Sequence, residues 1–390
     1  MILNYKGKKS EKEILEGIRP IQLKSYSGNP KSKSKLIKGD NLEVMSYLLN
    51  KCDLKGKIDL VYIDPPFSTN NLFRVSESRA NTISRSNSDT IAYDDSLIGD
   101  DYLEFIRERL ILLRELLSDK GSIYVHVDYK IGHYIKVLMD EIFGKQNFLN
   151  DLTRIKCNPK NFERKAYGNV KDMILFYSKT GNHIWNNPKA PLSDDDIKRL
   201  FKKIDKDGRR YTTVPLHAPG ETKNGATGQA WRGMMPPKGR HWRSSPSELQ
   251  KLDALGLIEW SETGVPRKKI YADEKDGKKI QDILEFKDPQ KPLYPTEKNL
   301  ELLKLIISAS SNKDSIVLDC FCGSGTTLVA AQQLGRTWIG IDKSDEAIKV
   351  ALKRLTPKHR TLTNEEEFEY LEQVDDFSEE NSKISALKQY

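Results

Sequence analysis

Along the first half of the chain, short apolar runs typical of strands alternate with segments whose apolar residues have helical spacing. Short apolar runs at residues 58–63, 121–127 and 173–177 predict strands, and the first stops at Pro65 because proline cannot continue a ladder. Between them, residues 101–117 and 134–143 predict helices; in the first, apolar side chains recur at helical spacing at Leu103, Ile106, Leu110, Leu113 and Leu117. This alternation predicts a wound, mostly parallel α/β sheet.

The alternation returns near residue 300. It predicts helices over 300–309, 326–334 and 346–355, and strands over 315–320 and 337–341. Residues 186–290 lose the rhythm and hold many prolines and glycines, together with Trp231, Trp242 and Trp260. The pattern therefore predicts a doubly wound sheet in two halves, 36–185 and 291–356, separated by a loop-rich insertion.

Three other segments show no clear core-forming pattern. Residues 1–35 are polar and lysine-rich and are interpreted as a basic arm, with regular structure beginning near Leu36. Residues 68–95 predict a long mobile loop, a feature that is usually functional or disordered in a compact domain. Residues 357–390 hold nine acidic and four basic residues and are interpreted as a peripheral acidic tail.

Composition limits the class of protein. The chain has 390 residues, of which 37% are hydrophobic, but no apolar run approaches the roughly eighteen residues of a membrane span. No apolar stretch follows the lysines near the start, so a secretory signal is not expected. Four cysteines are too few and too irregularly spaced for a disulfide framework, which favours a cytoplasmic location.

Positive charge is concentrated in the middle of the chain. The net charge is +8, and residues 151–290 contain 28 Lys and Arg against 19 Asp and Glu, a difference of +9. A basic segment attracts a phosphate backbone, although a solvated basic surface would have the same composition. Charge thus favours a nucleic-acid partner without establishing one.

A glycine-rich turn follows the predicted strand 315–320. Glycines allow close approach of a ligand to the backbone, and the following helix start offers free N–H groups. Asp342, seventeen residues after Gly325, ends the next strand, where a carboxylate can accept both hydroxyls of a ribose. The candidate cofactor-binding residues here are Asp319, Phe321, Gly323, Gly325, Thr326 and Asp342.

Two details favour S-adenosylmethionine over a dinucleotide at this turn. Leu328 stands where the dinucleotide fingerprint has its third glycine, and Asp319 would repel a pyrophosphate but attract the cationic amino-acid end of a methyl donor. A structural turn without a ligand is the other alternative. Cys320 and Cys322 lack further metal ligands, so no metal site is predicted.

The second motif is Asp64-Pro65-Pro66-Phe67, at the end of an apolar strand. An exocyclic base amine is a poor nucleophile because its lone pair is delocalised into the ring. A carboxylate from Asp64 and the carbonyl of Pro65 can each accept one of its N–H bonds, which directs the lone pair toward a methyl group. Pro65 and Pro66 make the turn rigid, and Phe67 offers a face on which a flipped base can stack.

Together the two motifs resemble the DNA amino-methyltransferases of the beta class, which include type III modification subunits and type II enzymes. The catalytic turn comes first, a variable basic segment follows, and the donor-binding turn comes last. The resemblance covers residues 36–185 and 291–355 and implies a Rossmann-like, S-adenosylmethionine-dependent fold. It also takes in residues 38–41 and 294–299, which implies that Asp40, Thr296 and Lys298 are donor-site residues.

The resemblance also implies a substrate and partners. Asp-Pro-Pro with an aromatic residue usually accompanies methylation of adenine N6 in double-stranded DNA; cytosine N4, an RNA amine and a subunit that needs a partner are the alternatives. Methylation of a cytosine ring carbon is excluded, because no cysteine here follows a proline. A homodimer and a cognate restriction endonuclease are candidate partners.

Arginines lie beside aromatic residues and glycines in the insertion, a composition that suits phosphate contact and base stacking. We interpret residues 151–290 as the target-recognition region, with candidate DNA contacts at Arg209, Arg210, Arg232, Arg240 and Arg243. The segment 68–95, which carries Arg74, Arg79 and Arg85, is expected to close over DNA.

Overall fold

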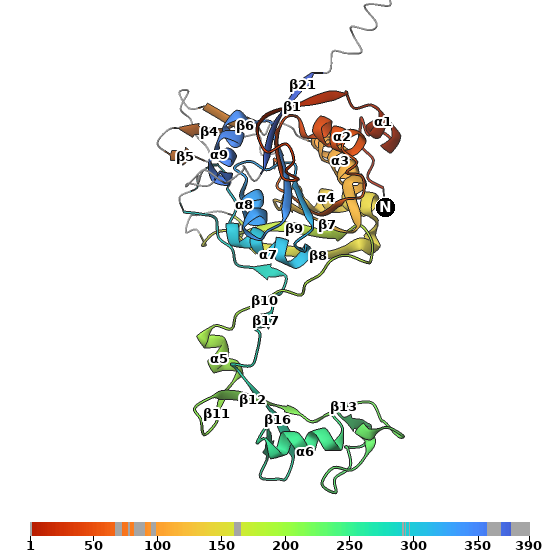
Figure 1. Ribbon diagram of the computed structural model, residues 1–390, viewed down its shortest axis with the longest axis vertical. Helices are drawn as coiled ribbons and strands as arrows, with labels where there is room; N and C mark the ends of the chain where they lie inside the picture. Colours follow the sequence, from red (N-terminus) through yellow and green to blue (C-terminus); the bar gives the residue numbers. More distant parts are fainter. Residues whose placement is uncertain are drawn as a thin grey trace, which may run out of the picture. The chain divides into compact units, whose positions relative to one another are not determined.

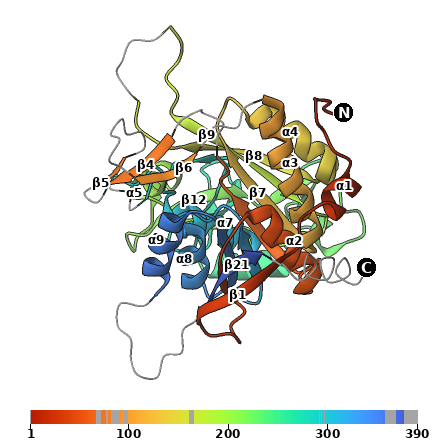
Figure 2. The ribbon, with the colours of Figure 1, turned by 90° about the horizontal axis from the view of Figure 1, so that it is seen from above.

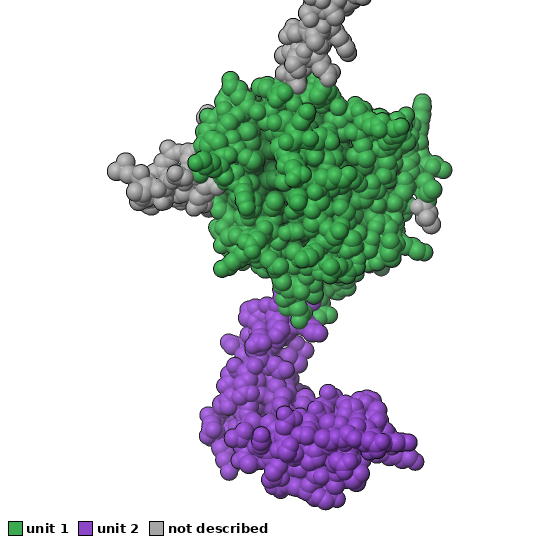
Figure 3. Space-filling model, turned by 45° about the vertical axis from the view of Figure 1, so that its right-hand side comes forward, with its two compact units in different colours: residues 1–187, 281–390 green, residues 188–280 purple. Residues whose placement is uncertain are grey.

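The computed structural model describes residues 2–66, 72–76, 79–81, 90–94, 99–159, 165–290, 292, 294–295, 297–356 and 368–375. These residues fall into two compact units (Figure 3). Unit 1 comprises Met1–Asn187 and Gln281–Tyr390, and unit 2 comprises Pro188–Ile280.

A ten-stranded sheet forms the centre of unit 1 among the described residues. Its middle strands are parallel, and β7, β9 and β8 pair antiparallel at one side. In spatial order the strands are β1 (Ile21–Gly28), β21 (Glu369–Asp375), β2 (Lys35–Lys38), β20 (Thr337–Asp342), β19 (Ile316–Asp319), β3 (Ile58–Ile63), β7 (Leu117–Val127), β9 (Lys171–Ser178), β8 (Phe148–Ile155) and β18 (Ile283–Leu284). The predicted wound, mostly parallel α/β fold is confirmed.

Helices cover both faces of this sheet, as Figures 1 and 2 show. One group is α2 (Asn41–Lys51), α3 (Gly99–Leu116) and α4 (Gly132–Met139), which continues as a π-helical turn, Asp140–Gly144, and a 3-10 turn, Lys145–Asn147. The other group is α7 (Leu300–Ser310), α8 (Thr326–Gln333) and α9 (Asp345–Leu355). Because both faces are covered, β3 is apolar along almost its whole length rather than alternating.

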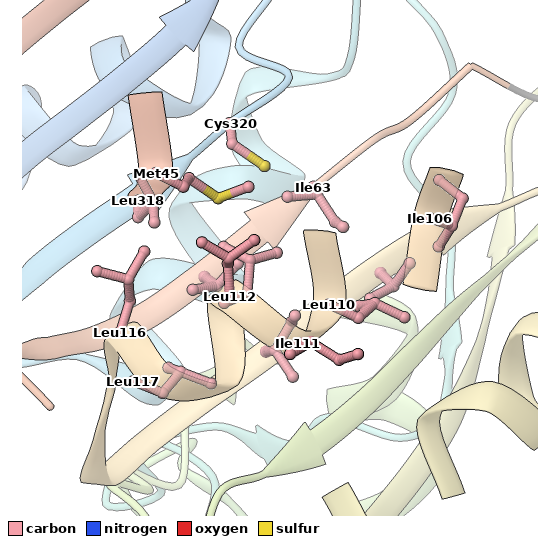
Figure 4. Packing of buried hydrophobic residues seen from close by; sticks show 14 of the residues in the cluster. Met45, Ile63, Ile106, Leu110, Ile111, Leu112, Leu116, Leu117, Leu318 and Cys320 are labelled. Atoms are coloured by element: carbon pink, nitrogen blue, oxygen red, sulfur yellow. The ribbon is translucent and has the colours of Figure 1, made fainter. Parts of the chain in front are cut away.

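The largest hydrophobic core lies between the sheet and the first helix group (Figure 4). The predicted stripe of α3, including Ile106 and Leu110, is fully buried against strand residues such as Ile63 and Leu318. Met45 on α2 and Cys320, at the end of β19, extend this core to the edge of the site described below. The same packing therefore stabilises the sheet and fixes the loops at its carboxyl edge.

Both ends of the chain contribute to the sheet, in contrast to the predicted arm and tail. Helix α1 (Glu11–Glu16) begins with a capping box between Ser10 and Glu13, and Ile14 and Ile21 are buried in the core. Strand β1 pairs with β21, which lies more than three hundred residues later. Regular structure thus begins at Glu11, and β21 is part of the fold. A sequence pattern cannot predict a pairing between such distant segments.

The segment predicted as a mobile loop contains three strands in its described parts. They are β4 (Leu72–Ser76), β5 (Arg79–Asn81) and β6 (Thr90–Asp94), which pair antiparallel in a small sheet. The prediction of a loop without secondary structure was therefore wrong for these spans. Arg85 lies outside the described residues.

Unit 2 has a small core of its own. Trp231 and Trp242 pack with Leu216, Leu249 and Ile258, so these tryptophans stabilise the unit. Its elements are β10 (Lys189–Ala190), α5 (Asp194–Leu200), β11 (Lys203–Ile204), β12 (Arg210–Pro215), β13 (His217–Pro219), a 3-10 turn Ala226–Gly228, β14 (Arg240–Trp242), α6 (Pro246–Ala254), β15 (Ile258–Trp260), β16 (Pro266–Tyr271) and β17 (Lys278–Lys279). Such short strands explain why the sequence pattern of this region is weak.

Within the described parts of the chain, no helix is long and apolar enough to cross a membrane.

The N-terminal segment is expected to contribute to stability. Ile14→Ala should lower the free energy of unfolding by about 2–5 kcal/mol, because the removed side chain is 3% exposed and leaves a cavity. Ile2→Ala is the control, since that side chain is 69% exposed and should cost less than about 0.5 kcal/mol. Urea denaturation followed by far-UV circular dichroism measures both, and equal small effects would contradict a docked N-terminal segment.

Candidate active site

A cleft of about 650 Å³ lies at the carboxyl ends of the central strands of unit 1. Asp64 follows β3, the glycine-rich turn follows β19, Asp342 ends β20, and Asp40 follows β2. Open α/β sheets bind their ligands at this edge, because loops from neighbouring strands meet there. The two motifs, more than 250 residues apart in sequence, thus line one cleft.

The glycine-rich turn shapes one wall of the cleft. Gly323 and Gly325 have φ angles of 49° and 76°, in the left-handed region that favours glycine, and Gly325 caps α8. Gly323 N donates to Asp342 Oδ2 (2.8 Å), and Ser344 N donates to Asp342 Oδ1 (2.9 Å). These bonds fix the Asp342 carboxylate, whose pKa is raised by burial.

Leu328 occupies the position of the glycine that the dinucleotide fingerprint would have. The helix nevertheless approaches the sheet closely, because β20 supplies a glycine there: a Cβ on Gly340 would lie 2.3 Å from Leu328 Cδ1. Because the small residue is on β20 rather than on the helix, α8 packs tightly against β20 without the third glycine of the fingerprint.

Asp319 is the most deeply buried carboxylate of the cleft, at 2% exposure. Its Oδ2 accepts a hydrogen bond from Thr327 Oγ1 (2.6 Å), and its Oδ1 accepts one from Phe321 N (3.0 Å). Burial, together with the negative charges of Asp64 and Asp342, raises the pKa of Asp319 to about 7. A cation bound beside it would favour the charged form, so the site suits a positively charged ligand group.

The opposite end of the cleft contains residues that the sequence interpretation missed. Asp40 caps α2, and Asn41 Nδ2 donates to Cys320 O (2.8 Å). Arg109 Nε donates to Asn41 Oδ1 (2.6 Å), and its guanidinium lies over the Phe105 ring, 3.5 Å from the centroid. Asn41, Phe105 and Arg109 line the cleft near Phe321. The sequence signal that could have identified this group is Arg109, a charged residue within the apolar pattern of α3.

Arg354 on α9 links Glu297 to the glycine-rich turn. Arg354 Nη2 lies 3.0 Å from a carboxylate oxygen of Glu297, and Arg354 Nη1 donates to Ser324 O (3.1 Å) and to Thr326 Oγ1 (3.0 Å). Thr326 is thereby held in place by α9. Arg354 gave no sequence signal beyond a charge at the end of a helix.

Asp64 lies between this segment and the sheet. Its Oδ2 contacts Lys298 Nζ in an ion pair, whereas its Oδ1 is buried and has no hydrogen-bond partner among the described residues. Tyr102 Oη donates to Pro66 O (2.5 Å), which restrains the turn, and Pro65 and Pro66 line the cleft. A buried acceptor without a partner costs free energy, so Oδ1 is suited to a donor that a ligand brings.

A buried hydrogen-bonded chain runs behind Asp64. Tyr62, two residues earlier on β3, bonds through its hydroxyl to His126 Nδ1 (2.8 Å), and His126 Nε2 lies 3.3 Å from Asp172 Oδ2. Burial lowers the pKa of His126, which favours a neutral imidazole. This chain joins β3, β7 and β9 beneath the catalytic turn and was not found from the sequence.

Two predicted site residues lie outside the described residues, and a third makes a contact that was not predicted. Phe67 and Thr296 are outside the described residues. Lys298, predicted at the donor, lines the cleft and contacts the carboxylate of Asp64; its contact with the donor stays a prediction. No group of His, Cys, Asp or Glu that could hold a metal occurs within the described part of the chain, and Cys320 and Cys322 are free and buried.

The predicted DNA-contacting arginines all lie in unit 2. Arg209 pairs with Asp273 (2.8 Å) and Glu274 (2.7 Å), and Arg232 pairs with Asp253 (2.5 Å). The others make weaker contacts: Arg210 Nη1 donates to Phe201 O (3.4 Å), Arg240 Nη1 lies 3.2 Å from His217 Nδ1, and Arg243 is exposed. Their contact with DNA stays a prediction.

A carboxylate that can hold a ribose, a buried carboxylate for a cationic group and an Asp-Pro-Pro turn with an open acceptor define the cleft of an amino-methyltransferase. The sequence profile of the N6/N4 DNA methylases matches residues 58–353. The chain therefore belongs to the N6/N4 DNA methylase family, whose methyl donor is S-adenosylmethionine.

The chain is also similar to individual proteins. The chain is 43% identical over 360 residues to the type II methyltransferase M.EcaI of Enterobacter cloacae, covering 90% of this chain and 77% of that protein. It is 28% identical over 363 residues to the type III StyLTI Mod subunit of Salmonella typhimurium, covering 84% of this chain but only 54% of that protein. A crystal structure of the M1.HpyAVI–SAM complex aligns with 19% identity and a TM-score of 0.44, over 82% of this chain and 100% of that one.

Donor binding is expected to depend on pH through Asp319. Below pH 7 its carboxyl is increasingly protonated and no longer attracts a cation, so the Kd for S-adenosylmethionine should rise toward tenfold per pH unit. Isothermal titration calorimetry without DNA between pH 5.5 and 8 measures this. Asp319→Asn, the matched control, should bind weakly with a flatter profile; the same steep profile in both proteins would contradict the role of Asp319.

Proposed function

We propose that the protein transfers a methyl group from S-adenosylmethionine to the N6 amine of an adenine extruded from double-stranded DNA. The observation that carries the proposal is the open carboxylate oxygen of Asp64, which is buried in the cleft that also contains Asp319 and Asp342. Membership of the N6/N4 family limits the target to an exocyclic amine but leaves the base open.

The residues of the cleft fit the parts of the donor. Each oxygen of Asp342 accepts one backbone N–H and keeps a second acceptor site for a ribose hydroxyl. Asp319 would hold the ammonium group, and Gly323, where an added Cβ would meet only Tyr294 within 4 Å, leaves room for the ligand. Asp40, beside Arg109, would meet the adenine end. When bound, the donor supplies a methyl group on positively charged sulfur, which makes that methyl electrophilic.

Asp64 activates the target amine in this proposal. Its Oδ1 accepts one N–H bond of the amine, and the Pro65 carbonyl accepts the other, so the nitrogen lone pair is directed at the methyl group. The bond from the nitrogen to the methyl group forms as the bond from the methyl group to sulfur breaks. The nitrogen then carries a positive charge and releases one proton, to Asp64 or to water. Extruding the base costs a few kcal/mol, which stacking on an aromatic side chain such as Phe67 would partly offset.

Lys298 has a positioning role in the same step. Its ammonium group offsets the charge of the Asp64 carboxylate in a buried position and occupies Oδ2, which leaves Oδ1 as the acceptor for the substrate. Lys298 belongs to the segment that Glu297 and Arg354 tie to the glycine-rich turn. The amine-binding carboxylate and the donor-binding turn are thus held by one continuous set of contacts.

Adenine is favoured over cytosine by the Asp-Pro-Pro turn followed by an aromatic residue. The two acceptors at Asp64 and Pro65 would also accept the N4 amine of cytosine, so cytosine N4 methylation is the second candidate. A homodimer and a cognate restriction endonuclease stay predictions that follow from the family resemblance.

The identity of the methylated nucleoside tests the proposal. The protein is incubated with labelled S-adenosylmethionine and unmethylated genomic DNA, or with RNA, and the nucleosides are resolved by mass spectrometry. We expect N6-methyldeoxyadenosine. N4-methyldeoxycytidine would refute the choice of base, a methylated ribonucleoside alone would refute the DNA substrate, and no product despite donor binding would refute an enzyme that acts without a partner.

A further inference from the structure

The arginines of unit 2 fall into two groups with different surroundings. Arg209 and Arg232 each face carboxylates at ion-pair distance. By contrast, four arginines form no ion pair with any carboxylate in the described part of the chain: Arg210, Arg240, Arg243 and Arg267. The charge of the second group is not neutralised within the protein, and it is therefore available to an anionic partner.

Three of these arginines, Arg240, Arg243 and Arg267, lie near His217. Arg240 Nη1 lies 3.2 Å from His217 Nδ1, and Arg243, directly after β14, donates its backbone N–H to Leu216 O (2.7 Å). Arg267 lies opposite Pro215 in the β12–β16 register, two residues before His217. Burial lowers the pKa of His217, and the charges of all three guanidinium groups lower it further, which is consistent with their gathering at one place.

The framework beneath this cluster is rigid. Strands β13 and β14 pair with His217 opposite Trp242, and Trp242, 3% exposed, donates its indole N–H to Gln229 O (3.0 Å). Arg267 is held by two hydrogen bonds, to Thr213 Oγ1 and Thr213 O (both 2.9 Å). The strands beneath the cluster and the Arg267 side chain are thus held in place by these contacts, so Arg267 loses little conformational entropy when it binds a partner.

The surrounding sequence is also basic. Residues 216–243 contain five basic residues (Lys223, Arg232, Lys238, Arg240 and Arg243) and one acidic residue. That acidic residue, Glu221, accepts a hydrogen bond from Gly239 N (3.3 Å). In Figure 1, β13 lies on the opposite side of unit 2 from α5 and β11, so this face is separate from the strand end that carries Arg209.

We propose that His217, Arg240, Arg243 and Arg267 form the surface of unit 2 that binds the phosphate backbone of duplex DNA, a surface termed here the β13–β14 arginine cluster. The inference rests on the proposed function, since it supplies the DNA contact that the methyl transfer needs. Phosphates relieve the repulsion among the guanidinium groups, and a two-stranded ribbon such as β13–β14 is narrow enough to enter a major groove. Arg209 and Arg232 are expected to stabilise unit 2 instead.

The dependence of DNA affinity on salt tests the cluster. Full-length protein is titrated into a short fluorescein-labelled duplex, and Kd is measured by anisotropy at several salt concentrations. Arg240→Gln combined with Arg243→Gln should weaken binding and reduce the slope of log Kd against log salt by about 1.8, since each lost phosphate contact contributes about 0.9. Arg240→Lys combined with Arg243→Lys should retain most of the slope, because lysine also neutralises phosphate.

The matched control removes the same charge elsewhere in the unit. Arg209→Gln combined with Arg232→Gln also lowers the net charge by two, but should leave the slope within error of the wild-type value. An unchanged slope in the Arg240/Arg243 variant, or an equal reduction in the control, would overturn the proposal. Far-UV circular dichroism and donor affinity verify that both variants are folded.

The failure of this inference is distinguishable from that of the proposed function. If the wild-type protein methylates DNA but the Arg240/Arg243 variant keeps the full salt slope, only the β13–β14 arginine cluster is refuted. If the slope falls as expected but no methylated nucleoside forms, the cluster is supported and the proposed reaction is refuted.

Discussion

The ion pair between Lys298 and Asp64 constrains the rest of the cleft. A carboxylate buried at the end of β3 requires compensation, and Lys298 provides it at one oxygen only. The other oxygen, Oδ1, stays buried without a hydrogen-bond partner among the described residues. The turn is restrained from two sides, by the prolines and by the bond from Tyr102 to Pro66 O. The site therefore holds an acceptor in place before any substrate binds. The free energy needed to bury and orient this acceptor is supplied by folding, so no reorganisation is needed during the reaction.

Those parts of the site that depend on local sequence could be predicted. Gly323, Gly325 and Asp342 follow from a strand, a turn and a helix start, and Asp64 follows from an apolar strand stopped by proline. Contacts between distant segments could not be predicted in the same way. The pairing of β1 with β21, the bond of Arg109 to Asn41 and the chain from Tyr62 through His126 to Asp172 each depend on segments that the sequence separates widely.

The proposed function assigns the chemistry to unit 1 and the recognition of DNA to unit 2. The described residues that line the cleft all belong to unit 1, whose sheet and helices fix the loops at its edge. Unit 2 has a separate tryptophan core and carries the β13–β14 arginine cluster. Short strands on an independent core can change their surface residues without disturbing the cleft, which suits a region that selects a DNA sequence.

The most direct test of the account is a single-turnover measurement of methyl transfer by Asp64→Asn and Lys298→Gln, with donor and DNA affinities measured in parallel. We expect both variants to bind the donor and DNA nearly as the wild-type protein does. We also expect a fall of at least about a hundredfold in the chemical rate for Asp64→Asn, because Lys298 would hold the amide oxygen and leave the NH2 group, a donor, facing the target amine. A wild-type rate in Asp64→Asn would contradict the central role of the open carboxylate oxygen.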